Sequence, residues 1–159
     1  MSTADFPSMT TAEIRSTFLK FFEERGLKLY PSSSLVPDDP SLLLANAGMN
    51  QFKEYYQGKK TMKEIGACSC QKCVRTNDID CIGEDGRHLS FFEMLGDFSF
   101  GGVSKEQACA WAFELITEKF HLPVERLYFT IFTDDDETHD VWRSLGVPED
   151  HISRLGEDD

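Results

Sequence analysis

The stretch from Gln71 to Phe100, QKCVRTNDIDCIGEDGRHLSFFEMLGDFSF, decides the fold of this chain. Its pattern predicts two strands joined by a charged loop that contains glycine. The first strand ends on Arg75, and the second begins with Arg87 and His88 and continues into paired phenylalanines. Guanidinium groups bind phosphate oxygens through two parallel hydrogen bonds, and an aromatic face stacks on a base. Cations beside aromatic side chains at a hairpin are therefore typical of a nucleoside triphosphate site.

The two strands are expected at 68–76 and 87–95. Residues two apart in a strand share a face. One side of the second strand is therefore expected to carry the side chains of Arg87, Leu89, Phe91 and Glu93. If Arg75 projects toward that side, one bent triphosphate would contact Arg75, Arg87 and Phe91. The alternative is that the phenylalanines are ordinary core and the arginines ordinary rim. Composition alone favours this alternative, because aromatic strands mostly face the core.

The composition indicates a folded soluble protein of one domain. The 159 residues are 40% hydrophobic and 12% aromatic, which is enough for a core. No apolar run approaches the length of a membrane span, and the N-terminus lacks the pattern of a signal peptide. The five cysteines are an odd count. They are expected to be reduced thiols in a cytoplasmic protein.

The net charge of −12, from 28 acidic and 16 basic residues, argues against a surface that binds nucleic acid as a whole. The basic residues gather in 51–75, so a polyanion would meet the middle of the chain. Lys59 to Lys63, taken alone, are more simply explained as a solvated loop.

Helix and strand signals alternate along the chain. Thr10 and Glu13 form a capping box that begins a helix, and Gly26 ends it. A short strand is expected at 27–30 and a short helix ending at Tyr56. The later elements are a helix from Ser104 with Gln107 as its capping partner, the strand LYFTIFT at 127–133, and a helix capped by Asp135 or Asp136 that runs through Trp142 to Gly146. Together these elements predict an α+β fold with a largely antiparallel sheet flanked by helices.

Other polar clusters are weaker candidates for chemistry. The thiols of Cys68, Cys70, Cys73 and Cys81 are the right number for tetrahedral zinc, but their C-x-C-x2-C-x7-C spacing is no pair of zinc knuckles, so zinc is not expected. The acidic run 134–137 is the pattern of a capped helix start. Among the four histidines, only His88 keeps a functional interpretation.

The hairpin resembles motif 2 of the class II aminoacyl-tRNA synthetases, in the version found in the alanyl-tRNA synthetases. The resemblance covers nearly the whole chain. It is carried, in order, by the strings TAEIRSTFLKFFEERG, PSSSLVPDDPSLLLANAGMNQFK, QKCVRT, RHLSFFEMLGDFSF and ERLYFTIFTDDDE. It implies a class II synthetase-like sheet, a motif 1-like region at about 11–37 and a motif 2-like hairpin at about 68–100. Residues 1–159 would then be a single domain, the amino-terminal part of an activation domain that stops before motif 3.

The resemblance also implies roles for single residues. Arg75 matches the catalytic arginine that binds the α-phosphate of ATP, and Arg87 matches the loop arginine on the outer phosphates, with His88 as its helper. Phe91 matches the aromatic that stacks on adenine, and Met94 stands where the family's backbone contacts the base. The implied cofactors are ATP and Mg²⁺, with no metal ligand in this segment. The implied substrates are alanine and tRNA.

The sequence departs from the family at several positions. Asp97 replaces a usual asparagine, and GGVSKE stands where FGDYFKE-like strings are usual. A negative charge at Asp97 would weaken ATP binding unless magnesium bridges it. No GLER-like motif 3 string is present. The first hypothesis is therefore an alanine–tRNA ligase activation-domain fragment that is inactive alone and associates through an exposed sheet edge. The alternative is a stand-alone, non-catalytic paralogue that binds nucleotide or protein.

Overall fold

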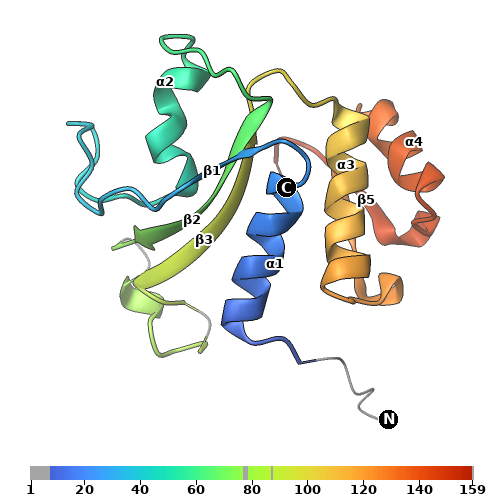
Figure 1. Ribbon diagram of the computed structural model, residues 1–159. Coiled ribbons are helices and arrows are strands. Elements are labelled where there is room, and N and C mark those ends of the chain that lie inside the picture. Colours follow the sequence, from blue (N-terminus) through green and yellow to red (C-terminus); the bar gives the residue numbers. More distant parts are fainter. Residues whose placement is uncertain (1–7, 77–78, 87, 159) are drawn as a thin grey trace. The chain divides into compact units, whose positions relative to one another are not determined.

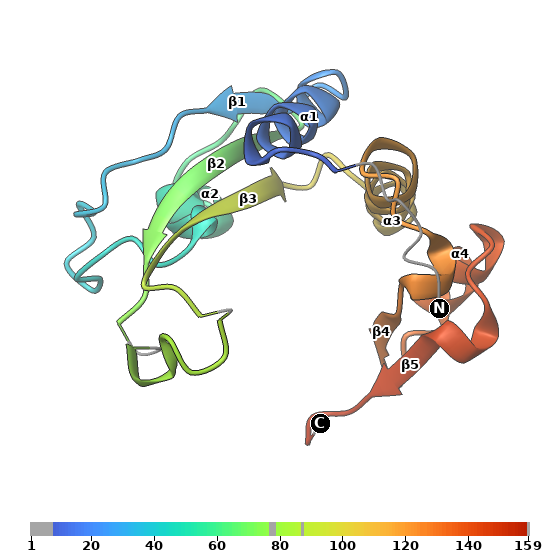
Figure 2. The same ribbon diagram turned by 90° about the horizontal axis from the view of Figure 1, so that it is seen from below.

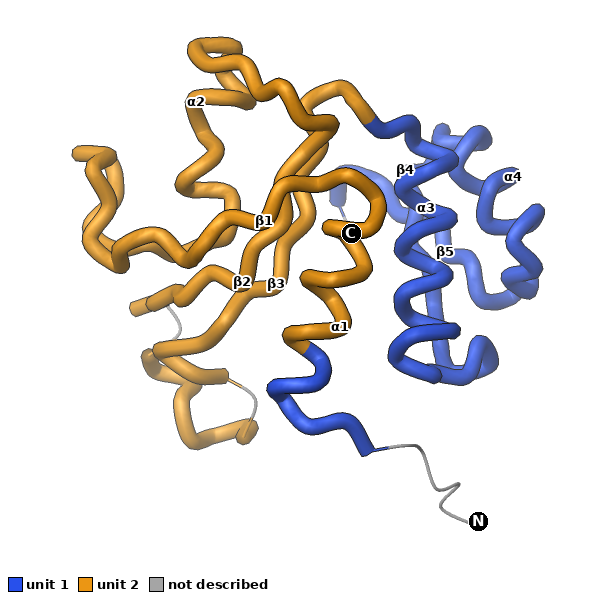
Figure 3. Tube along the Cα trace, in the orientation of Figure 1, with its two compact units in different colours: residues 1–14, 103–159 blue, residues 15–102 orange. Residues whose placement is uncertain are grey.

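The computed structural model describes residues 8–76, 79–86 and 88–158, which form helices, strands and short 3-10 turns (Figure 1). The chain divides into two compact units, shown in Figure 3. Unit 2 comprises residues 15–102, and unit 1 comprises residues 1–14 together with 103–159. The predicted α+β class is confirmed. The prediction of a single domain over 1–159 stays a prediction, because compact units can be parts of one domain.

Helix α1, Thr11–Glu23, begins at the predicted capping box. The Thr10 amide donates to the Glu13 carboxylate at 2.7 Å, and the Glu13 amide donates to the Thr10 hydroxyl at 3.3 Å. These bonds satisfy donors that the first turn of a helix leaves unpaired. The helix buries Phe18, Phe21 and Phe22. Gly26 then ends the helical segment with φ +88°, a left-handed conformation that favours glycine.

The sheet of unit 2 has the strand order β1-β2-β3. Its strands are β1, Lys28–Tyr30, β2, Gly66–Val74, and β3, Phe91–Ser99. The β2–β3 pair is antiparallel as predicted, whereas β1 runs parallel to β2. Both hairpin strands are displaced from their predicted bounds, and β3 begins only at Phe91, so His88 lies in the preceding loop. Within that loop, His88 bonds to the Asp85 carboxylate instead of pairing with a strand.

The two faces of this sheet carry different partners. Helix α1 lies on one face, and α2, Lys53–Tyr56, lies on the other with the 3-10 turn η1, Gly48–Phe52, that precedes it (Figure 2). On the η1 face the Phe52 ring is 1% exposed and lies 4.7 Å from the Phe98 ring, centroid to centroid. Gly48 fits there because a Cβ atom would lie only 3.2 Å from the Phe98 ring. The turn η1 is therefore seated closely on the hairpin.

Unit 1 is built from two helices and a small parallel sheet. Its elements are α3, Lys105–Glu114, which continues through the π-helical turn η3, Leu115–Lys119; β4, Phe129–Phe132; α4, Asp136–Ser144; and β5, Ile152–Leu155. Strands β4 and β5 pair in parallel. Leu115, Ile131 and Val147 are its buried side chains, and the Phe129 and Trp142 rings lie 4.6 Å apart. Both predicted caps are present, because the side chains of Ser104 and Asp135 accept the amides of Gln107 and Thr138.

Short 3-10 turns complete the chain at Ile79–Cys81, Val124–Arg126 and Glu149–His151. Within the described ranges, no helix has the length and apolar character needed to cross a membrane. Strands β1 and β3 are the outer strands of the sheet in unit 2. Association through such an edge stays a prediction.

The cap of α4 makes stability depend on pH. The hydroxyl and amide of Thr138 and the ammonium of Lys105 all donate to the Asp135 carboxylate, and they lower its pKa to about 2. A carboxylate with a lowered folded pKa stabilises the protein above its unfolded pKa of about 3.9, and that contribution is lost as the pH falls toward 2. We expect the free energy of unfolding to fall more steeply below pH 5 in the wild type than in Asp135→Asn. Urea denaturation followed by circular dichroism measures both profiles, and parallel profiles would contradict this role.

Candidate functional site

Arg75 is fixed at the end of strand β2 by its backbone and its side chain. Its amide donates to the Ser90 carbonyl at 2.9 Å, which continues the hairpin by one pair. The side-chain Nε donates to the Asn46 carbonyl at 3.2 Å, and the guanidinium carbon lies 5.3 Å from the centre of the Phe92 ring. Cation–π contact and the carbonyl together orient the guanidinium group. In the described part of the chain no other acceptor is assigned to its side chain, which leaves donors for an anion.

The hairpin register decides which aromatic side chain shares the face of Arg75. Cys73 pairs with Phe92 and Val74 pairs with Phe91. Side chains alternate along a strand, so Phe92 shares the side of Arg75 and Phe91 lies on the opposite side. Phe91 is 51% exposed. The condition that Arg75 projects toward the side of Phe91 is therefore not met, and Phe92 is the aromatic that the structure brings to Arg75.

Met94 lies on the same face as Phe92 and contacts turn η1. Its sulfur accepts a hydrogen bond from the Gly48 amide at 3.2 Å. The side chain therefore holds the turn on the sheet, two residues beyond Phe92. The sequence analysis expected Met94 within this strand but on the side away from Arg87 and Phe91, whereas the register places it on the face of Arg75 and Phe92. Its role at the base stays a prediction.

His88 and Arg87 belong to the loop before β3. The His88 Nδ1 lies 2.6 Å from an Asp85 carboxylate oxygen, and its amide donates to the other oxygen at 3.0 Å. The loop itself thus supplies the partner of this imidazole. Arg87 lies outside the residues that the structure describes.

Glu93 contacts α1 rather than the face of Arg75. One of its carboxylate oxygens accepts from Arg15 Nε at 3.1 Å and from Arg15 Nη2 at 2.6 Å. Cys70 lies close to this pair, and burial raises the pKa of its thiol. In the hairpin register, the face opposite to that of Arg75 carries Cys70, Glu93 and Asp97. The charge of Asp97 therefore belongs to the strand side opposite Arg75.

A small cavity adjoins Arg75, with a volume of about 150 Å³. It is lined by residues 41–44, Asn46, Val74, Arg75 and Thr76. Pockets for whole small molecules usually measure ~300–1,000 Å³. This cavity has room for a phosphate group rather than a nucleotide. A larger cavity, of about 690 Å³, lies between the loop at 33–40 and α2 and shares no lining residue with it.

The described residues contain no group of three or more histidine, cysteine or acidic side chains that could hold a metal ion. Cys68 and Cys73 lie on opposite faces of β2, so they cannot bind one metal ion together. Burial raises the pKa of Cys68 to about 11 and also raises that of Cys73, which disfavours the thiolate form that binds zinc. The described residues around Arg75 likewise offer no carboxylate cluster for Mg²⁺.

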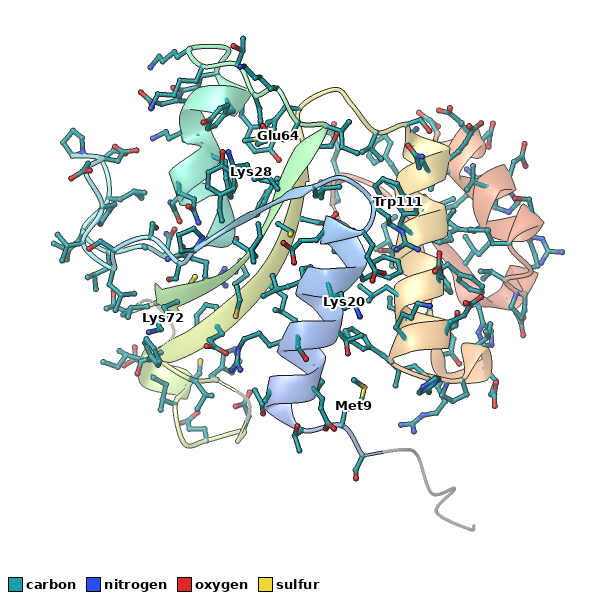
Figure 4. All side chains as sticks on the ribbon, viewed as in Figure 1. Met9, Lys20, Lys28, Glu64, Lys72 and Trp111 are labelled. Atoms are coloured by element: carbon teal, nitrogen blue, oxygen red, sulfur yellow. The ribbon has the colours of Figure 1, made fainter. Side chains whose placement is uncertain are left out.

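Two of the five lysines between residues 51 and 75 form ion pairs within unit 2. Lys53 contacts Asp39 at 2.6 Å, and Lys60 contacts Glu54. Figure 4 shows Glu64 near Lys28 at the start of β2, where the two form an ion pair of 3.4 Å, and Lys72 further along the strand. The pairs at Lys53 and Lys60 offset part of the positive charge of this region. The interpretation of Lys59 to Lys63 as a solvated loop stays a prediction.

Two groups of the site, the Asn46 carbonyl and the Phe92 ring, were not identified from the sequence. The Asn46 carbonyl is a backbone group, which any residue type would supply. Phe92 could be separated from Phe91 only by the strand register, which the length of the hairpin loop leaves open. The sequence showed only that one of two adjacent phenylalanines, Phe91 or Phe92, would face Arg75.

Comparison of the whole sequence with known protein families identifies the family of this chain. The family described as tRNA synthetases class II (A) matches residues 13–159. The chain therefore belongs to the class II tRNA synthetases, and its α+β fold is that of part of their domain.

Within this family the chain is similar to alanine–tRNA ligases. It is 53% identical over 147 residues to the chloroplastic/mitochondrial alanine–tRNA ligase of Oryza sativa subsp. indica, which covers 92% of this chain and 15% of the relative. It is 51% identical over 152 residues to the alanine–tRNA ligase of Microcystis aeruginosa, covering 95% of this chain and 17% of that relative. The chain thus spans about one sixth of the length of these curated relatives.

The ion pair on the α1 face should contribute to stability. Its side chains are 36% and 33% exposed, and one oxygen of Glu93 receives two donors. We expect Glu93→Gln to lower the free energy of unfolding by about 0.5–1 kcal/mol, in the upper range of exposed pairs. Urea denaturation measures this. Glu24→Gln is the control, because it breaks an exposed pair of 3.8 Å between Lys20 of the same helix and the turn that follows it. An equal or larger loss in Glu24→Gln would contradict the expectation.

Proposed function

We propose that this chain carries the ATP-holding part of an alanine-activating centre, and that in its full context it serves as an alanine–tRNA ligase. The observation that carries the proposal is the orientation of Arg75 by the Asn46 carbonyl and the Phe92 ring. Membership in the class II family and about 50% identity to alanine–tRNA ligases support the choice of substrate.

Arg75 would act at the α-phosphate of ATP. The alanine carboxylate attacks that phosphorus, the bond to the β,γ-pyrophosphate breaks, and alanyl adenylate and pyrophosphate result. Negative charge grows on the non-bridging oxygens of the α-phosphate during this step. A cation that is already oriented stabilises this charge more in the transition state than in the ground state. The alanyl group is then transferred to a hydroxyl at the end of tRNA, with release of AMP.

The remaining roles follow the face of Arg75. Phe92 takes the aromatic role in place of Phe91, because it lies on that face, and the backbone at Met94 lies further along the same strand for the base. Arg87 and His88 stay assigned to the outer phosphates. Their loop, which joins the two strands, leads back to the end of the hairpin where Arg75 lies. Mg²⁺ would be held mainly by phosphate oxygens, since the described residues offer it no cluster.

The cellular location is part of the proposal. All five cysteines are free, which supports a reducing compartment such as the cytoplasm. The rice relative is named chloroplastic/mitochondrial, so an organelle matrix is the other reducing compartment that the relatives suggest.

Replacement of Arg75 by alanine tests the central assignment. We expect Arg75→Ala to weaken ATP binding by about 10- to 100-fold, since charge-assisted hydrogen bonds contribute about 1.5–3 kcal/mol. Adenosine binding should not change, because adenosine has no phosphate. Isothermal titration calorimetry of the 159-residue chain measures both ligands.

The two neighbouring phenylalanines provide the matched control. Phe92→Leu should weaken binding of both ATP and adenosine, and Phe91→Leu should leave both unchanged. ATP binding that survives Arg75→Ala would contradict the phosphate role. A larger loss in Phe91→Leu than in Phe92→Leu would contradict the choice of face.

A second prediction concerns catalysis by the chain itself. The cavity at Arg75 is smaller than a nucleotide pocket and the chain spans one sixth of its relatives, so we expect little or no alanine-dependent pyrophosphate exchange from residues 1–159. Radiolabelled exchange measures this directly. Robust exchange would show that the 159 residues suffice. Absence of both exchange and ATP binding would instead favour the non-catalytic interaction module.

A further inference from the structure

Gln71 is a buried polar side chain that bonds to Ser33 in the segment at 31–47, to Gln51 in η1 and to its own strand. It is 1% exposed. Its Oε1 accepts from the amide and hydroxyl of Ser33 at 2.8 and 3.1 Å and from Gln51 Nε2 at 3.1 Å. Its Nε2 donates to the carbonyls of Ser33 at 3.3 Å and Lys72 at 2.7 Å. Both ends of the amide are therefore satisfied, as burial of a polar group requires.

The segment at 31–47, called here the edge segment, continues the sheet where β1 stops. Strand β1 pairs with Ala67–Ser69 of β2 and ends at Tyr30, before Pro31. Beyond that point the Lys72 amide donates to the Ser32 hydroxyl at 3.0 Å, and the Val74 amide donates to the Ala45 carbonyl at 2.9 Å. The edge of β2 beyond Ser69 therefore bonds to the edge segment, which is not a regular strand. Gln71 lies between the part of β2 that pairs with β1 and the part that bonds to the edge segment.

A chain of contacts joins Gln71 to the guanidinium group of Arg75. The edge segment has a first arm that contains Ser33 and Leu35 and a second arm that contains Ala45 and Asn46. Gln71 binds the first arm at Ser33. The Ala45 amide donates to the Leu35 carbonyl at 2.8 Å, which links the first arm to the second. The next residue of the second arm, Asn46, supplies the carbonyl that accepts from Arg75 Nε. The position of this carbonyl therefore depends on how the edge segment is seated.

We infer that Gln71 is a positioning residue for Arg75. It seats the edge segment so that the Asn46 carbonyl turns the guanidinium group toward the phosphates of the nucleotide. The inference rests on the proposed function, and it adds a residue that never contacts the ligand. A purely structural role for Gln71 would lower stability without favouring one ligand over another, whereas a positioning role affects only ligands that carry phosphate.

The test compares ATP with adenosine on the 159-residue chain by calorimetry. Gln71→Met keeps the length of the side chain and removes its hydrogen bonds. We expect it to weaken ATP binding by about 3- to 10-fold, the loss of part of a charge-assisted contact, and to leave adenosine binding unchanged. The double variant Gln71→Met/Arg75→Ala should bind ATP no more weakly than Arg75→Ala alone, because coupled residues are not additive.

Two controls separate positioning from stability. Ser69→Ala changes a side chain on the same strand and face that is fully buried and whose hydroxyl has no partner among the described residues. Phe21→Leu destabilises unit 2 from the α1 face. Both should leave the ratio of ATP to adenosine affinity unchanged. If Gln71→Met does not fold, Ser33→Ala removes one bond to Gln71 and should lower ATP affinity by about twofold, without an effect on adenosine.

The outcomes are distinguishable. Equal losses for ATP and adenosine in Gln71→Met, an unchanged ATP affinity, or additivity with Arg75→Ala would overturn the positioning role and leave the proposed function standing. Unchanged ATP binding in Arg75→Ala would overturn both. A loss confined to ATP that disappears in the Arg75→Ala background supports the inference.

Discussion

The antiparallel register between β2 and β3 is the constraint on which the rest of unit 2 depends. Nine residue pairs, from Gly66↔Ser99 to Val74↔Phe91, set which side chains face α1 and which face η1. Side chains alternate with a period of two, so a slip of one residue would exchange the two faces completely. The closely seated Gly48 and the ion pair to Glu93 lie on opposite sides. Each of them fits only this register.

The two faces are stabilised by different physics. On the α1 side, phenylalanines of the helix bury apolar area against β2, and the pair of Arg15 and Glu93 adds an electrostatic contact. On the other side, the edge segment has little regular structure of its own, so its backbone groups need partners from elsewhere. Gln71 and the backbone of β2 provide them. The face proposed for the ligand is therefore held by directional bonds in addition to the packing of Phe52 against Phe98.

Local signals made much of the fold predictable. The caps at Thr10, Ser104 and Asp135 act within one turn of a helix, so their residue types and spacing are enough. The hairpin was recognisable from its strands and its loop. The parallel pairing of β1 with β2 was not, because nothing within three residues of strand reports a partner almost forty residues away. At the site, Arg75 was found from its place in a family motif, whereas the choice between Phe91 and Phe92 needed the register.

The architecture of the hairpin separates two kinds of sequence change. Arg75, Phe92 and Met94 are located by strand pairing, so insertions or deletions in the loop between the strands leave their relative positions intact. The loop residues, among them His88 with its partner Asp85, have no such protection, because their positions depend on the loop's length. Over evolutionary time the end of the site that would meet the outer phosphates is thus free to diverge. The end that would hold the base and the α-phosphate is limited to substitutions that preserve the pairing.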